Sequence, residues 1–261
     1  MRQRPFMQVD VFSPTPYLGN PLAVVLDGEG LADAEMQRFA RWTNLSETAF
    51  VLPPTPPGAD YRVRIFTPGG ELPFAGHPTL GSCHAWLAAG GRPAQPGRVV
   101  QECAQGLVPL RVGEGGALAF AAPPTTRTPI GEDELAPVLH ALGLQRADVR
   151  ACERLDNGPC FWALLLADAD RVLALQPDCA ALHALGVQAG VAALHPRQGV
   201  ALIGRASREA RAFARAPEPA QPDLEVRVFF NAGASVREDP ITGSFNASLA
   251  QWLIDAGHIE A

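Results

Sequence analysis

Many short stretches of the sequence alternate apolar and polar residues, which is the pattern of a β-strand with one buried face. Met7–Phe12 follows this pattern, with every second residue from Met7 apolar. Leu107–Val112 and Ala117–Phe120 flank a turn that contains E-G-G, and this arrangement predicts a β-hairpin. Helix-like segments lie between the strand candidates, so the pattern predicts an α/β (α+β) protein with mixed or antiparallel sheets.

One predicted helix follows Asp33. Its apolar residues recur at helical spacing and form a stripe on one face: Met36, Phe39 and Ala40. Asp33 is a favoured N-cap residue, and Asn44 is a suitable residue at which the helix can stop. We therefore expect a helix that Asp33 caps and that ends at Asn44.

Two segments repeat the same order of a strand, a polar loop and an alanine-rich helix. The strands Val63–Phe66 and Val226–Phe229 read V-R-I-F and V-R-V-F. The helices that follow lie at Gly76–Gly90 and Gly243–Gly257, and in both ranges the two glycines are 14 positions apart. A glycine at the end of each helix is a common C-terminal cap. Chance similarity of two ordinary strand–loop–helix units is the alternative explanation.

The repeat predicts how the chain is divided. Asn20–Leu26 and Asn157–Leu166 are a further pair of similar apolar strand candidates, and the proline-rich stretch Ala121–Pro129 is a natural linker. We predict two pseudo-symmetric halves, residues 1–122 and 123–261, each with a twisted sheet wrapped around a central helix.

Composition narrows the class of protein. The 261 residues carry a formal net charge of −6 and no basic run, which argues against nucleic acid as a partner. The longest apolar run, Phe161–Ala167, has seven residues and cannot span a bilayer, and the N-terminus lacks the apolar segment of a secretion signal. We therefore expect a soluble cytoplasmic protein that uses neither a membrane nor nucleic acid.

Missing residue types exclude several kinds of chemistry. All 21 basic residues are arginine, so the chain has no lysine for a Schiff base or for a Walker A phosphate loop. The five cysteines form no C-x-x-C pair, and the adjacent Cys83 and His84 would point about 100° apart on a helix. We expect no metal site, and any chemistry must use carboxylates, histidines, hydroxyls, thiols or backbone amides.

Glu47 is the first candidate catalytic residue. It lies in N-L-S-E-T-A-F-V, at the same alternating phase as Ala49 and Val51. If those residues face a core, Glu47 faces it too, where an unpaired carboxylate is costly to ionise. Burial raises a carboxyl pKa toward neutral pH, and a carboxylate of that kind suits a general base. A strand-edge glutamate that reaches an arginine is the alternative.

The turns that begin the two repeated helices carry further candidates. His77 lies in G-H-P-T, and Asp239 and Ser244 lie in E-D-P-I-T-G-S. Free N–H groups at helix N-termini bind anions such as carboxylates, and pseudo-symmetric packing would bring these ends to one cleft. Helix capping explains His77 and Asp239 equally well, and Ser244 is also suited to a cap or turn.

Four phrases of the sequence resemble those of the PhzF-like family of phenazine-biosynthesis isomerases. They are G-N-P-L-A-V-V, N-L-S-E-T-A-F-V, R-I-F-T-P-G-G-E-L-P-F-A-G-H-P-T-L-G and E-D-P-I-T-G-S, and the resemblance runs from residue 9 to about residue 257. It implies the fold of diaminopimelate epimerase, with the active site in the cleft between two pseudo-symmetric halves. It also implies a homodimeric isomerase that needs no cofactor and acts on a small carboxylate-bearing molecule.

The resemblance implies roles for individual residues. Glu47 would take the proton and return it, and His77 and Asp239 would assist the transfer and orient the substrate. Four residues at the two helix starts would hold the carboxylate and polar groups of the substrate: Gly76, Thr242, Gly243 and Ser244. Phe245 stands where the family commonly has a small residue, so we expect it to narrow the pocket and exclude a cyclohexadiene acid.

Two other functions are compatible with the sequence. A non-catalytic metabolite-binding or scaffold protein could retain the pocket. A racemase or epimerase of the same fold would need a thiol at each helix start, and Gly76–His77 and Gly243–Ser244 provide none. Chains of the family usually continue beyond the helix that ends near Gly257, whereas this sequence stops at Ala261, so we expect either a truncated chain or a second sheet without an edge strand.

Overall fold

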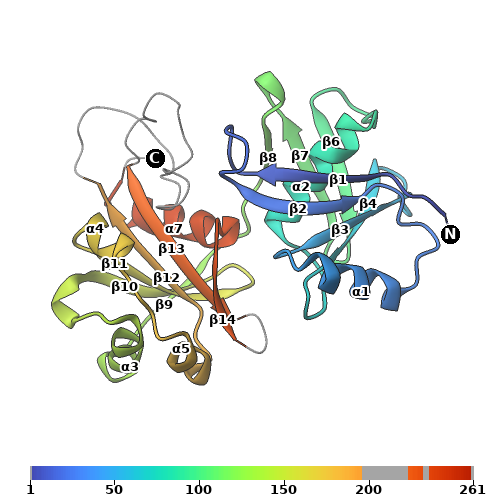
Figure 1. The fold of residues 1–261 in the computed structure, drawn as a ribbon. Helices are drawn as coiled ribbons and strands as arrows, with labels where there is room; N and C mark the ends of the chain where they lie inside the picture. Colours follow the sequence, from blue (N-terminus) through green and yellow to red (C-terminus); the bar gives the residue numbers. More distant parts are fainter. Residues whose placement is uncertain (1, 196–222, 232–234, 260–261) are drawn as a thin grey trace. The chain divides into compact units, whose positions relative to one another are not determined.

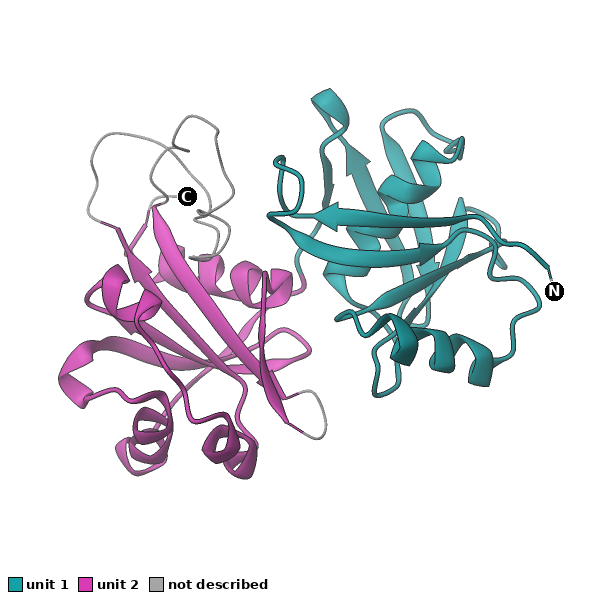
Figure 2. Ribbon diagram, in the orientation of Figure 1, with its two compact units in different colours: residues 1–122 teal, residues 123–261 magenta. Residues whose placement is uncertain are grey.

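The structure is a computed structural model that describes residues 2–195, 223–231 and 235–259 (Figure 1). The chain divides into two compact units, unit 1 (residues 1–122) and unit 2 (residues 123–261), and the boundary lies in the proline-rich segment (Figure 2). Among the described residues, each unit holds one sheet that curls around one helix. The predicted fold class is confirmed.

Unit 1 contains an eight-stranded sheet in the order β1-β2-β3-β4-β6-β7-β8, with β5 paired to β4. β2 and β3 are parallel neighbours, and so are β4 and β6. β7 and β8 form the predicted hairpin. The elements are β1 (Phe6–Val11), β2 (Asn20–Val25), α1 (Asp33–Thr43), β3 (Thr48–Leu52), β4 (Tyr61–Phe66), β5 (Glu71–Leu72), α2 (Gly76–Ala88), β6 (Arg98–Cys103), β7 (Gly106–Val112), a 3₁₀ turn (Glu114–Gly116) and β8 (Leu118–Phe120).

Helix α2 occupies the centre of unit 1 because it is apolar on nearly all sides, and such a helix is stable only when buried. Cys83 and Ala85 are buried together with residues of β1, β2, β3, β4, β6 and β7. The close approach depends on Gly81, where a Cβ atom would lie 2.5 Å from Leu22 Cδ2 and 2.9 Å from Val11 Cγ2. A side chain at this position would push the helix away from the sheet.

Helix α1 packs on the opposite face of the sheet, and its N-terminus differs from the prediction. Asp33 is the first helical residue, and Ala32 occupies the N-cap position. The backbone N–H of Ala32 donates to Glu35 Oε2 at 2.9 Å, so the glutamate closes the first turn. Asp33 instead binds Arg64 Nη1 at 2.7 Å. The helix ends at Asn44 as predicted, with a left-handed φ of 54°.

Unit 2 contains a six-stranded sheet in the order β14-β13-β12-β11-β10-β9. Helices α3, α4 and α5 pack on one face of this sheet, and α7 packs on the other. The elements are β9 (Thr126–Pro129), α3 (Glu132–Leu142), a 3₁₀ turn (Arg146–Asp148), β10 (Val149–Asp156), β11 (Cys160–Leu166), α4 (Ala169–Leu173), α5 (Cys179–Leu185), β12 (Ala189–Leu194), β13 (Leu224–Asn231), β14 (Val236–Asp239) and α7 (Gly243–Asp255).

The pairing of the strands confirms the predicted repeat. β10 to β14 pair in sequence as β1 to β5 do, first antiparallel, then parallel, then antiparallel twice. Arg64 and Glu71 form two hydrogen bonds of 2.7 Å between β4 and β5. Arg227 and Glu238 form the same two bonds, also of 2.7 Å, between β13 and β14. The V-R-I-F and V-R-V-F segments therefore occupy equivalent positions.

Helix α7 is the central helix of unit 2 and buries Phe245, Leu249 and Trp252 against the sheet. The expectation that Phe245 narrows a ligand pocket is wrong, because its side chain is fully buried and its ring centroid lies 5.3 Å from that of Phe161. Gly190 of β12 makes room for this ring, since a Cβ atom there would lie 2.2 Å from it.

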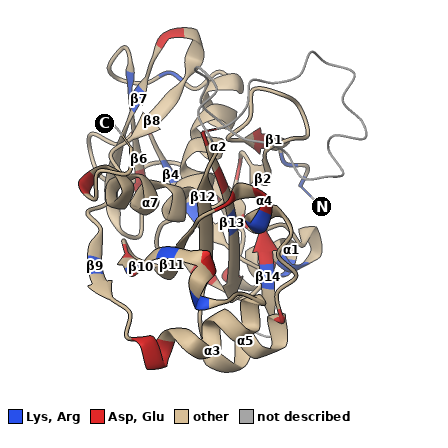
Figure 3. Cartoon of the chain, turned by 90° about the vertical axis from the view of Figure 1, so that its left-hand side faces the viewer, with Lys and Arg blue, Asp and Glu red and all other residues tan. Residues whose placement is uncertain are grey.

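The surface helices of unit 2 have ordinary helix electrostatics. Acidic residues gather in the first turn of α3 (Figure 3): Glu132, Asp133 and Glu134. Carboxylates at this end interact favourably with the helix dipole. Within the described part of the chain, every helix falls short of the length and apolarity that a membrane span requires.

We predict that Gly190→Ala lowers the free energy of unfolding by about 1–3 kcal/mol, because the added methyl group overlaps the Phe245 ring. Urea denaturation followed by tryptophan fluorescence measures the change. Gly70→Ala is the matched control, since a Cβ atom at Gly70 would meet no atom within 4 Å. Adding Phe245→Leu should restore part of the lost stability. Equal stability of the two alanine variants would contradict the packing.

Candidate active site

Glu47 and His77 meet at one end of the unit 1 sheet. β2 and β3 are parallel, so both begin at this end, and Glu47 immediately precedes β3. His77 is the second residue of α2, whose N-cap residue is Ala75, so His77 does not cap the helix. Glu47 Oε2 and His77 Nδ1 lie 2.8 Å apart. The two side chains are 18% and 7% exposed, so water has little access to the pair.

The His77 ring has a defined arrangement of protons. Its Nε2 atom lies 3.0 Å from the backbone carbonyl oxygen of Asn20, and a carbonyl oxygen only accepts hydrogen bonds. Nε2 therefore carries a proton, and a further proton lies between Nδ1 and Glu47 Oε2. Either Glu47 is a carboxylic acid that donates to Nδ1, or His77 is an imidazolium that donates to a carboxylate. In both forms the two side chains share one transferable proton.

The surroundings of Glu47 differ in part from the prediction. Ala49 and Val51 face the core around α2, as the alternation predicts. Glu47 lies just before the strand, and its carboxylate is paired. Its partner is His77. Glu47 is therefore not the unpaired core carboxylate that the alternation suggested, and its described partner is a histidine, where the alternative expected an arginine.

Two residues that the sequence did not single out complete this end of unit 1. Asn20, the first residue of β2, is buried and supplies the carbonyl oxygen for His77. Phe12 packs its ring on the His77 imidazole, with the ring centroids 5.9 Å apart, and has a left-handed φ of 71°. The turn residues of F-S-P-T-P-Y-L-G are a sequence signal for an irregular loop here. They do not indicate that Phe12 contacts a histidine 65 positions later.

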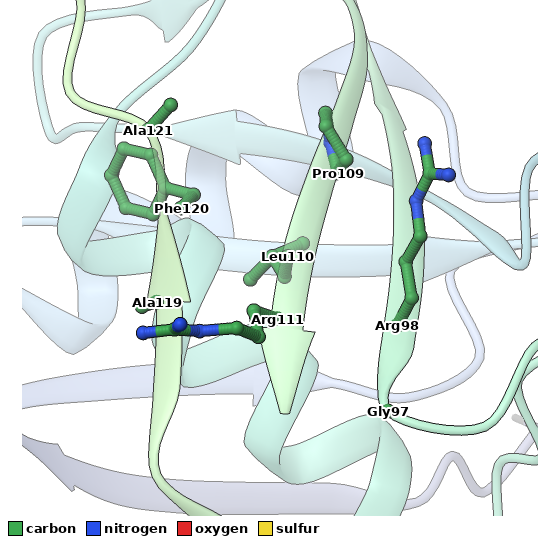
Figure 4. A pocket seen from close by; sticks show the side chains of 8 residues that line it. All are labelled: Gly97, Arg98, Pro109, Leu110, Arg111, Ala119, Phe120 and Ala121. Atoms are coloured by element: carbon green, nitrogen blue, oxygen red, sulfur yellow. The ribbon is translucent and has the colours of Figure 1, made fainter. Parts of the chain in front are cut away.

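The start of α2 is packed under an aromatic ring. A Cβ atom at Gly76 would lie 2.9 Å from Phe120 Cζ, so the glycine leaves the room that this ring occupies. Phe120 also lines a cavity of about 410 Å³ over β6, β7 and β8, together with Arg98 and Arg111 (Figure 4). The glutamate–histidine pair does not line this cavity.

The predicted residues of unit 2 gather at the start of α7. Thr242 is its N-cap residue, and the Thr242 hydroxyl donates to Asp239 Oδ2 at 2.7 Å. Asp239 ends β14 and does not cap the helix itself. Gly243 and Ser244 are the first two helical residues. Backbone N–H groups of a first helical turn have no acceptor within the helix, so they are suited to an anionic ligand.

Asn157 ties the start of α7 to the loop that precedes β11. Its side-chain amide donates to the backbone carbonyl oxygen of Ser244 at 2.8 Å. In unit 1 the corresponding tie runs in the opposite direction, from the His77 ring to the backbone of Asn20. A helix start is thus fixed to the start of a neighbouring strand in both units.

The predicted site residues form two groups, one in each unit: Glu47, Gly76 and His77 in unit 1, and Asp239, Thr242, Gly243 and Ser244 in unit 2. The first group can exchange a proton with a bound molecule, and the second can bind an anion. Among the described residues, no group of three or more histidines, cysteines, aspartates and glutamates is arranged to hold a metal ion.

We predict that the neutral His77 ring is the tautomer with its proton on Nε2, because Nε2 donates to the Asn20 carbonyl. Imidazole ¹⁵N NMR distinguishes a protonated ring nitrogen from an unprotonated one. His140, an exposed residue of α3, is the control and should show a mixture of tautomers. An unprotonated Nε2 on His77 would contradict the arrangement.

The chain is similar in sequence to curated proteins. A protein of Schizosaccharomyces pombe named antisense-enhancing sequence 1 is 41% identical over 184 residues, which are 68% of this chain and 62% of that protein. A trans-2,3-dihydro-3-hydroxyanthranilate isomerase of Pseudomonas fluorescens is 39% identical over 181 residues, again 68% of this chain and 62% of that protein. The chain thus spans about three fifths of the length of these curated relatives.

The same family appears among solved structures. The Bacillus anthracis phenazine biosynthesis protein of the PhzF family has a TM-score of 0.77 at 23% identity, over 97% of this chain and 81% of that chain. This likeness shows the fold. The family model described as phenazine biosynthesis-like protein matches residues 9–261. The chain therefore belongs to the phenazine biosynthesis-like (PhzC-PhzF) family.

Proposed function

We propose that the protein is a cofactor-independent isomerase that moves a proton between two carbon atoms of a small carboxylate-bearing metabolite. The observation that carries this proposal is the Glu47–His77 pair, whose side chains share one proton across 2.8 Å. The name of the Pseudomonas fluorescens relative supports the proposal, and it suggests a cyclic unsaturated acid as the substrate.

Glu47 is the group that reacts with the substrate. Its carboxylate accepts a proton from a carbon next to the unsaturated system, and the electron pair of that C–H bond passes into the conjugated system. The carboxylic acid then returns the proton to a second carbon, which restores the carboxylate and leaves the protein unchanged.

His77 holds Glu47 in both protonation states. Because Nε2 donates to the Asn20 carbonyl, the ring keeps Nδ1 directed at Glu47. As an imidazolium it donates from Nδ1 to Glu47 Oε2 when Glu47 is a carboxylate, and it keeps this hydrogen bond while the other carboxyl oxygen holds the proton taken from the substrate. His77 therefore acts through Glu47, as a positioning residue.

The start of α7 binds the carboxylate of the substrate in this proposal. The N–H groups of Gly243 and Ser244 are the donors, and Asp239, held by the Thr242 hydroxyl, orients a polar group of the substrate. Gly76 offers the equivalent backbone N–H group on α2. We further propose, from the family resemblance, that the protein works as a homodimer in the cytoplasm.

Glu47→Gln is expected to lower the incorporation of solvent deuterium into trans-2,3-dihydro-3-hydroxyanthranilate by about 10²–10⁴-fold, because an amide cannot accept the proton. NMR in D₂O measures the incorporation, and other small cyclic unsaturated acids are tested in parallel. Glu29→Gln makes the same change at an exposed position and should keep full activity.

Two results would refute the proposal. One is a wild-type protein that exchanges no deuterium with any of these acids, and acid binding without exchange would point to a non-catalytic binding protein. The other is a Glu47→Gln variant with full activity.

A racemase or epimerase that uses two cysteines is not favoured by the thiols of the described chain. Cys83 of α2 is fully buried, and burial raises the pKa of its thiol to about 12, so the thiol is protonated at neutral pH. We therefore expect iodoacetamide to leave deuterium exchange unchanged, with Cys83 unmodified in mass spectrometry. Loss of exchange in step with alkylation of Cys83 would support thiol chemistry instead.

A further inference from the structure

The loop between β1 and β2, residues 12–19, is anchored to His77 at both ends. At its start, the Phe12 ring packs on the His77 imidazole with centroids 5.9 Å apart. At its end, the carbonyl of Asn20 accepts the hydrogen bond from His77 Nε2 at 3.0 Å. The loop projects beyond the sheet where β1 ends and β2 begins (Figure 1). Any movement of this loop is therefore coupled to the position of His77.

The backbone of this loop is strained at two aromatic residues. Among the described residues, only Phe12, Tyr17 and Asn44 are non-glycine residues with positive φ, and Asn44 is a helix terminus. Phe12 has φ 71° and Tyr17 has φ 69°, a conformation that bulky side chains rarely adopt. Such strain persists where surrounding contacts impose it and is frequent in ligand clamps.

Phe12 makes a contact that can stabilise its strained backbone conformation, whereas the structure describes no such contact for Tyr17. Phe12 has its ring on His77. The Tyr17 side chain is 96% exposed and has no described ring contact or hydrogen bond. Trp42, which is 79% exposed, differs because its ring lies 5.7 Å from that of Phe39 and its φ is negative. A strained, fully exposed aromatic side chain on a loop whose ends contact His77 is suited to cover a ligand.

Tyr17 lies on the segment that leads directly to the Glu47–His77 pair. It lies three residues before Asn20, and three extended residues span at most about 11 Å. Asn20, His77 and Glu47 are joined by hydrogen bonds of 3.0 and 2.8 Å. Tyr17 is therefore separated by only a short stretch of chain from the residues that a molecule bound at Glu47 would meet.

We propose that Tyr17 closes over a molecule bound at Glu47 and stacks its ring on the planar, unsaturated part of that molecule. Flat rings gain most from stacking on flat partners, so Tyr17 is a residue that determines specificity for planar cyclic acids over saturated ones. Closure also excludes water from the shared proton of Glu47 and His77. This inference rests on the proposed function only in placing the substrate at Glu47.

The experiment uses the fact that the chain has two tyrosines. Incorporation of 3-fluorotyrosine gives two ¹⁹F signals, one from exposed Tyr17 and one from Tyr61, which is buried and donates to Gln101 Oε1 at 2.8 Å. Tyr17→Phe identifies the signals. Benzoate and cyclohexanecarboxylate are the probes, because they share a carboxylate and a six-membered ring but only benzoate is planar.

Benzoate is expected to shift and broaden the Tyr17 signal and to leave the Tyr61 signal in place, with a smaller effect from cyclohexanecarboxylate. The imidazole ¹⁵N signals of His77 report that the acid is at the site. In calorimetry, Tyr17→Gly should weaken benzoate binding about tenfold. The melting temperature should not fall, since glycine adopts the left-handed conformation without strain. Trp42→Ala is the control and should leave benzoate binding unchanged.

The outcomes separate this inference from the proposed function. If benzoate shifts the His77 signals and the Tyr17 signal stays still, the role of Tyr17 is wrong and the isomerase proposal stands. If benzoate moves Tyr17 but no acid exchanges deuterium, the role of Tyr17 stands and the isomerase proposal fails. If neither acid moves the His77 or the Tyr17 signals, the role of Tyr17 is wrong, and the deuterium-exchange experiment alone decides the isomerase proposal.

Discussion

The hydrogen bond from His77 Nε2 to the Asn20 carbonyl oxygen is the contact on which the rest of the candidate site depends. It joins the start of α2 to the start of β2 and leaves Nδ1 facing Glu47 at the start of β3. Asn20 is 1% exposed and His77 is 6% exposed, so losing this bond would leave buried polar groups unsatisfied, at about 1–3 kcal/mol each. The left-handed backbone of Phe12 costs a similar amount, about 1–3 kcal/mol, and accompanies the contact of its ring with His77. The pair is therefore built on the buried core of unit 1.

In each unit a glycine makes room for larger side chains where the central helix packs on its sheet, but the glycine lies on the helix in one unit and on a strand in the other. In unit 1 the glycine is on the helix, where Gly81 of α2 admits Leu22 and Val11 of the sheet. In unit 2 the glycine is on the strand, where Gly190 of β12 admits Phe245 of α7. Both arrangements bring the N-terminal half of the helix onto the sheet. The position of each helix start, and with it the N–H groups offered to a ligand, follows from core packing.

Local patterns were sufficient to predict the hairpin of β7 and β8 and the helices α1, α2 and α7, because each of these elements depends mainly on neighbouring residues. They also pointed to Glu47 and His77 as candidates, but their contact joins residues 30 positions apart and depends on the packing of α2 beside β3. Phe245 was misplaced because its true neighbour, Gly190, is 55 positions away. The role of Phe12 could not be predicted, since it follows from a tertiary contact made with an unusual backbone conformation.

The two units carry different groups at equivalent positions, and this difference bears on the type of reaction. Glu47 precedes β3, whereas Gln188 precedes the equivalent strand β12. The second residue of α2 is His77, whereas that of α7 is Ser244. Strand β5 ends in Leu72, whereas β14 ends in Asp239. An amide and a hydroxyl do not accept a proton at neutral pH, so Gln188 and Ser244 do not reproduce the proton-sharing pair. The carboxylate of unit 2, Asp239, stands at a different position and accepts a hydrogen bond from the Thr242 hydroxyl. Inversion at one carbon by two bases needs matched acceptors on opposite faces of the substrate, whereas a single carboxylate removes and returns a proton on one face. The asymmetry within the repeat therefore favours proton transfer between two carbons over racemisation at one.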